Sequence, residues 1–150
     1  SQYTLNPNTG IIIDAARFEQ LSKSSDTSSL ESAARLYQGR YFENEAVEEF
    51  FIAEGQYYHE QYLRVMDQLI EGAINAADWE KALHYCRTLL NRDALWEPAY
   101  RSMMIIHHRM GNPGSVLQTF QQCQQALNRE IGSGVSAETQ ALLNELLGRT

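Results

Sequence analysis

The chain has 150 residues, 43% of them hydrophobic, which fits one domain with a continuous core. Its net charge of -7 disfavours unaided binding to a phosphate backbone, which depends on clustered lysine and arginine. Residues 1–10 lack the basic and apolar pattern of a signal peptide, and no apolar run is long enough to span a bilayer, so we expect a cytoplasmic protein that contacts neither nucleic acid nor membrane through this segment.

The N-terminal segment combines two short strand-forming runs with a turn between them. Residues 11–13 are β-branched, residues 3–5 include one aromatic and one β-branched residue, and residues 6–10 are rich in asparagine, proline and glycine. This pattern predicts a hairpin without a further strand to pair with. We therefore expect strand to be confined to the first 13 residues or to be absent.

Helical periodicity dominates the rest of the chain. Asp14 is the expected N-cap of the first helix, and Ser136 is the expected N-cap of the last. Apolar residues recur at near-helical spacing over residues 43–76, which predicts one long helix or two abutting ones, with Gly55 and Gly72 as candidate kinks. The predicted helices cover residues 15–23, 29–38, 43–76, 79–91, 97–110, 114–129 and 137–147.

An internal repeat of 34 residues decides the fold class. An offset of this length places the turn at residues 77–79 on that at residues 111–113, and Ala82 on Val116. This is the tetratricopeptide (TPR) period, in which helix pairs bury their apolar stripes by stacking on one another. We predict an all-α, TPR-like helical repeat of antiparallel pairs in a right-handed superhelix, with about six or seven helices. The same offset aligns Leu69 with Met103, Cys86 with Phe120, and Leu89 with Cys123.

Six short segments occur in order along residues 30–147: LYQG at 36–39, YLR at 62–64, DWEKAL at 78–83, DALWEPAY at 93–100, IG at 131–132 and SAET at 136–139. Together they resemble the bacterial transcriptional activator domain, a TPR-like module of antibiotic-regulatory activators and related response regulators. The chain departs from that family at Ala94 and Val135, where proline is usual. It also departs at Phe51 and Gln56, where tryptophan and arginine are usual.

The resemblance implies how the chain is organised and what it contacts. Residues 14–150 would form the activator domain, and residues 1–13 would be the tail of an upstream winged-helix segment that reads DNA. Asp14 and Phe18 match that junction. The implied partners are RNA polymerase, other domains of the same regulator, or a second copy in a homodimer. A free-standing TPR adaptor or scaffold unrelated to transcription is the alternative function.

No recognised constellation for catalysis, metal or cofactor binding occurs in the sequence. The histidines lack metal-ligand spacing, and glycine-rich phosphate loops and nucleophile elbows are absent. Cys86 and Cys123 are expected to be buried thiols. We therefore predict a non-catalytic protein without cofactor or metal. A small-molecule sensor is a third alternative, although core packing explains its aromatic cluster more simply: Phe50, Phe51, Tyr57, Tyr58 and Tyr62.

Two surfaces are predicted to contact partners. Six glutamates lie between Arg40 and Arg64 without an intervening cation, and this acidic face, including Glu48 and Glu49, is either a solvated surface or a docking site for a basic partner. The second surface is the concave groove that the first helix of each TPR pair lines. Repeat positions assign to it Arg64, Asp67, Glu71, Asn75, Arg101, His108 and Arg109.

Overall fold

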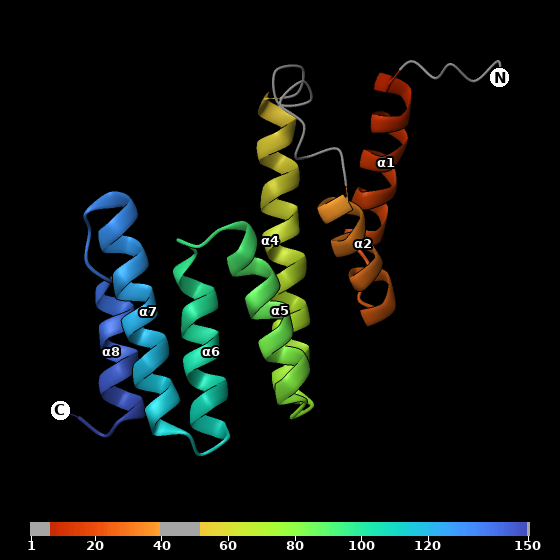
Figure 1. Cartoon of the computed structure of the whole chain (residues 1–150). Helices are drawn as coiled ribbons and strands as arrows, with labels where there is room; N and C mark the ends of the chain where they lie inside the picture. Colours follow the sequence, from red (N-terminus) through yellow and green to blue (C-terminus); the bar gives the residue numbers. More distant parts are fainter. Residues whose placement is uncertain (1–6, 40–51, 150) are drawn as a thin grey trace. The chain divides into compact units, whose positions relative to one another are not determined.

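The computed structural model describes residues 7–39 and 52–149, and all regular structure in these ranges is helical (Figure 1). Seven helices and no strands occur there, which confirms the predicted all-α fold. Ser136 caps the last helix, as expected. The helices are α1 (Pro7–Ser22), α2 (Thr27–Gly39), α4 (Ile52–Asn75), α5 (Trp79–Arg92), α6 (Glu97–Arg109), α7 (Pro113–Ile131) and α8 (Ala137–Leu146).

The predicted N-terminal hairpin is wrong for residues 7–13, which belong to α1. Pro7 begins this helix, a position that suits proline because its φ is preset and its missing N–H would be unpaired anyway. The isoleucine run at residues 11–13 is too short to form a stable strand without a neighbour. Asp14 consequently lies inside α1 and is not its N-cap. Residues 1–6 lie outside the described residues.

The predicted long helix corresponds to α4, which runs without interruption from residue 52 to residue 75. It continues past both Gly55 and Gly72, so neither glycine ends it. A side chain added at Gly72 would meet nothing within 4 Å, and no close packing contact requires a glycine there. Residues 43–51, the first part of the predicted helix, lie outside the described ranges.

The chain divides into two compact units, residues 1–69 and 70–150. In the first unit α1 packs on α2, and aromatic rings fill the core. Tyr37 stacks on Tyr62 with ring centroids 4.3 Å apart, while Phe18 lies 5.5 Å from Tyr37 and 6.0 Å from Tyr58. The Tyr37 hydroxyl is 3.0 Å from Nδ1 of His59. Tyr58 and Tyr62 therefore pack within the unit, which favours the core interpretation of the aromatic cluster over a small-molecule sensor.

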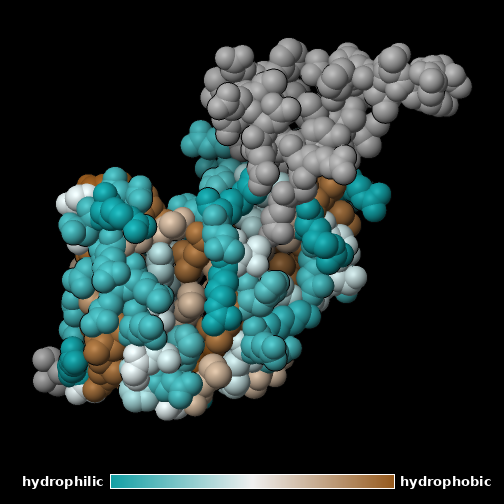
Figure 2. Space-filling view, in the orientation of Figure 1, coloured by the Kyte–Doolittle hydropathy of each residue, from teal (hydrophilic) through white to brown (hydrophobic). Residues whose placement is uncertain are grey.

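In the second unit, helices α5 to α8 follow one another in antiparallel order (Figure 1). Helix α6 packs against α5 and α7, and α8 packs against both α6 and α7. Hydrophilic residues dominate the visible surface of these helices, with hydrophobic residues in narrow stretches between them (Figure 2). Two groups of buried residues belong to its core: Tyr100, Cys123, Ala126 and Leu127, and Met104, Val116, Phe120 and Leu143.

Helix boundaries reproduce the 34-residue repeat. Helix α4 ends at Asn75 and α6 ends at Arg109, while α5 begins at Trp79 and α7 begins at Pro113. Each pair of boundaries is 34 residues apart, so the register predicted from the sequence is confirmed. The residues that it aligns are all buried: Leu69, Met103, Ala82, Val116, Cys86, Phe120, Leu89 and Cys123.

The two turns at these boundaries share one hydrogen-bond pattern. The backbone N–H of Asp78 donates to the Ala73 carbonyl at 2.9 Å, and that of Asn112 donates to the His107 carbonyl at 2.9 Å. These bonds close the helix end in the manner of a Schellman motif, in which the residue before the donor adopts a left-handed conformation. The repeat is therefore present in backbone geometry as well as in apolar pattern.

The left-handed residue of each turn predicts opposite effects of two substitutions. Ala77 has φ 56° and Gly111 has φ 77°, a region that penalises a side chain but not glycine. Ala77→Gly is expected to raise the free energy of unfolding by about 0.5 kcal/mol, and Gly111→Ala to lower it by about 1 kcal/mol. Denaturant melts followed by circular dichroism measure both shifts, and shifts of the same sign would contradict the shared geometry.

Candidate partner-binding site

A groove of about 480 Å³ lies between α6 and α8 in the second unit. Its lining residues recur every three or four positions along each helix, so they share one helix face. Ile105 and Leu142 are half-buried there, whereas Glu138 and Glu145 are exposed. The lining consists of Pro98, Arg101, Ser102 and Ile105 from α6, and Glu138, Ala141, Leu142 and Glu145 from α8.

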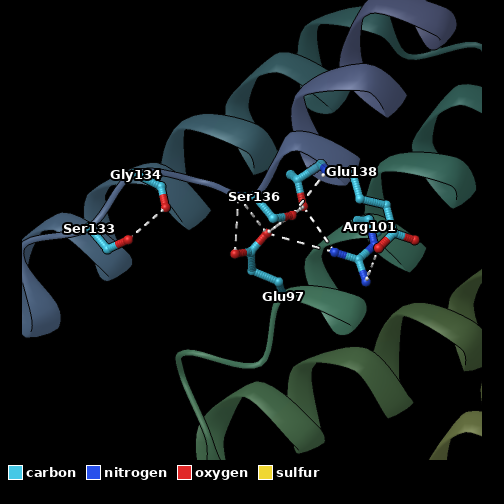
Figure 3. Close-up of polar contacts among 7 residues, drawn as sticks. Glu97, Arg101, Ser133, Gly134, Ser136 and Glu138 are labelled. Carbon is cyan, nitrogen blue, oxygen red and sulfur yellow. Dashed lines mark hydrogen bonds and ion pairs between the residues drawn. The ribbon is translucent and has the colours of Figure 1, made fainter.

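Glu97 joins the start of α6 to the start of α8 (Figure 3). Both of its carboxylate oxygens accept from the Ser136 backbone N–H at 3.2 Å, and Oε2 also accepts from the Ser136 hydroxyl at 2.8 Å. The Thr139 hydroxyl donates to the same oxygen. In a capping box, a glutamate of the capped helix itself would bond the N-cap N–H. Here Thr139 occupies that helix position, and α6 supplies the carboxylate instead.

Arg101 adds a second link between the two helices (Figure 3). Its Nη1 donates to Thr139 Oγ1 at 3.0 Å and lies 3.7 Å from Glu97 Oε2, while its Nη2 lies 3.5 Å from Glu138 Oε2. The Arg101 side chain is only 18% exposed, whereas that of Glu138 is 76% exposed. Arg101 is thus used within the unit, and Glu138 keeps most of its surface for solvent or a partner.

The network contains a charged carboxylate at neutral pH. Burial raises the pKa of Glu97, whereas hydrogen bonds from Thr139 and Ser136 and the charge of Arg101 lower it. The lowering effects together outweigh burial, so the pKa of Glu97 lies below the ordinary glutamate value. The negative charge sits at the N-terminus of α8, where the helix dipole also favours an anion. This network positions α8 and thereby sets one wall of the groove.

Of the residues predicted from repeat position, Arg101 lines this groove. His108 and Arg109 are exposed on the last turn of α6, beyond the lining residues. The structure therefore brings one predicted residue into the groove, where Glu97 and Glu138 hold it.

The remaining predicted contact residues lie on α4 or outside the described ranges. The acidic pair Glu48 and Glu49 falls in residues 40–51, which the structure does not describe. The four residues on α4 are all exposed, two in each unit: Arg64 and Asp67 in the first, and Glu71 and Asn75 in the second.

Sequence reasoning missed the role of α8 as a groove wall. Glu97 and Ser136 are 39 residues apart, and no local sequence pattern predicts their contact. The signal that could have located the groove is helical spacing, because residues 98, 101, 102 and 105 on one helix and 138, 141, 142 and 145 on the other each mark a single face.

The model of the bacterial transcriptional activator domain matches residues 13–147. The chain belongs to this family. The resemblance drawn from six short segments is therefore confirmed, together with its TPR-like fold. The Glu97 network now explains two of those segments physically, because the activator domain uses residues 93–100 and 136–139 to join α6 to α8. No match was found among curated proteins or among solved structures.

Metal-ligating groups, membrane spans and cysteines were compared with the expectations from the sequence. Among the side chains that the structure describes there is no group of three or more metal ligands, and no described helix has the length and apolar content that a membrane crossing requires. Cys86 and Cys123 are buried, as predicted, and neither forms a disulfide. Burial raises the pKa of Cys123 to about 11, which keeps this thiol protonated and unreactive.

Proposed function

We propose that this activator domain is the non-catalytic, protein-binding part of a bacterial transcriptional activator, and that it contacts RNA polymerase or a second copy of the regulator. The family match over residues 13–147 carries the proposal, because the matching family is the bacterial transcriptional activator domain. The groove between α6 and α8 supports it by providing a surface that the domain does not fill itself.

Charge supports a division of labour between this domain and the part of the regulator that reads DNA. With 12 basic and 19 acidic residues, the chain lacks the excess of cations that neutralising phosphates requires. One of its arginines, Arg101, is held by carboxylates of its own unit. Contact with DNA therefore falls to another domain. A free-standing adaptor unrelated to transcription is disfavoured by the family match.

A tethering experiment tests the proposal. Residues 1–150 fused to an unrelated sequence-specific DNA-binding domain are expected to raise transcription from a bacterial promoter that carries the matching operator, since the fusion brings a polymerase-binding surface to the promoter. The unfused chain is expected to show no salt-sensitive binding to duplex DNA. Reporter output and fluorescence anisotropy measure the two results.

The control fusion carries a TPR-like helical domain of similar size and charge in place of residues 1–150. Sedimentation equilibrium of the unfused chain separates self-association from contact with polymerase. Reporter output equal to that of the control fusion, combined with a monomeric chain, would contradict the proposed function. Salt-sensitive DNA binding by the unfused chain would overturn the division of labour.

A further inference from the structure

The groove between α6 and α8 is suited to binding one more helix. Its lining residues span residues 98–105 and 138–145, which is two turns, or about 10 Å, of each helix. Both walls are helices whose interior backbone groups are already paired, so an extended peptide would find no backbone partners there. A helical occupant brings its own satisfied backbone and needs only side-chain contacts, as in helix-in-groove recognition.

The apolar part of the lining requires an aliphatic side chain from the occupant. Ile105 on α6 and Leu142 on α8 are half-buried, and Ala141 beside Leu142 is small and exposed. Binding of such a side chain would bury apolar surface of the groove that is now in contact with water. A leucine or isoleucine of the occupant would complement these apolar residues.

The charged residues of the lining determine which charge on a partner would be complementary. Glu138 and Glu145 are exposed and seven residues apart on α8, which places them on one face. Arg101 is the only cation of the lining and is held by Glu97 and Glu138, while Glu145 has no ion pair among the described residues. The lining therefore has more carboxylates than cations, because Arg101 is already shared between two of them, and a basic occupant complements this excess of negative charge.

We propose that the α6–α8 groove binds an amphipathic helix of a partner protein. That helix places an aliphatic side chain against Ile105 and Leu142, and lysine or arginine residues about two turns apart against Glu138 and Glu145. The inference rests on the proposed function, because it names the surface and the partner chemistry through which the activator domain makes its protein contact.

Three synthetic helical peptides of about 15 residues test the proposal against the whole 150-residue chain. The first carries a central leucine and two lysines seven positions apart. The second replaces the lysines with glutamates, and the third replaces the leucine with asparagine. Fluorescence anisotropy at low and high salt is expected to show salt-sensitive binding of the first peptide, with the other two binding at least about tenfold more weakly.

Variants of the chain assign this binding to the groove. The double variant Glu138→Lys and Glu145→Lys is expected to weaken the first peptide by about tenfold, since two attractive contacts become repulsive. Glu145→Lys alone, which leaves the Arg101 network intact, is expected to give a smaller loss. The matched control, Glu80→Lys with Glu130→Lys, reverses two exposed glutamates outside the groove and is expected to leave binding unchanged.

The outcomes separate this inference from the proposed function. Equal binding of the lysine and glutamate peptides, or unchanged binding in the double groove variant with its helical content intact, would overturn the groove assignment. If the chain forms a dimer, and the groove variants dissociate this dimer whereas the control variant does not, the groove binds a second copy of the chain. That result would also overturn the groove assignment. Failure of the tethered wild-type domain to activate transcription, together with a monomeric chain, would contradict the proposed function while leaving the peptide result in place.

Discussion

Replacing Leu89 with alanine is expected to lower the free energy of unfolding by about 2–5 kcal/mol, because it removes methyl groups from a fully buried site and leaves a cavity. Ala82→Leu is expected to lower it by about 1–3 kcal/mol by the opposite mechanism, since Ala82 is also fully buried and the added atoms have no room. Denaturant melts monitored by circular dichroism measure both losses.

Leu90 provides the control for the core prediction. It adjoins Leu89 on α5 but is only half-buried, so Leu90→Ala is expected to cost less than Leu89→Ala. Melts of the Leu89 and Ala82 variants that coincide with the wild type would contradict the closely packed, buried positions of both residues.

Glu97→Ala is expected to lower the free energy of unfolding by about 2–4 kcal/mol, with α8 as the helix that loses its attachment. Removing the carboxylate leaves the Ser136 N–H and hydroxyl and the Thr139 hydroxyl without their shared acceptor. It also deprives Arg101 of one of its two carboxylates. Hydrogen exchange of α8 amides, measured beside global melts, locates the loss.

The variant Glu97→Gln separates the contribution of the carboxylate's charge from the contribution of its hydrogen bonds. The amide can still accept hydrogen bonds from Ser136 and Thr139 but has no charge for Arg101 or the helix dipole, so an intermediate loss is expected. Exchange of α8 amides that is unchanged in both Glu97 variants would contradict the role assigned to this carboxylate.

The same residue predicts a pH dependence. The pKa of Glu97 is lower in the folded chain than its ordinary value, so the folded state binds this proton less readily than the unfolded state. The stabilisation is therefore fully present above the ordinary glutamate range and is lost as pH falls through the lowered folded pKa. The wild-type stability should fall more steeply on acidification than that of Glu97→Gln, and parallel profiles would show that Glu97 is not the titrating group.

Helix content and repeat register could be predicted from the sequence because both depend on local spacing. Apolar residues at helical periodicity predicted the helices, and the 34-residue offset placed Ala82 and Val116 at equivalent buried positions. The predicted cap at Ser136 is also local, since its side chain accepts from a backbone N–H three residues away. The family resemblance drew on the same short segments and was confirmed by the match over residues 13–147.

The N-terminal conformation and the groove were decided by tertiary structure. The isoleucine run at residues 11–13 favours strand by propensity, but strand propensity depends strongly on tertiary context, and these residues are helical in α1. Glu97 and Ser136 lie 39 residues apart, so their contact depends on how α8 docks against α6. Sequence spacing determines which face of each helix is apolar. Packing of the whole unit determines which of these faces meet, and it also determines which carboxylates remain exposed beside the groove.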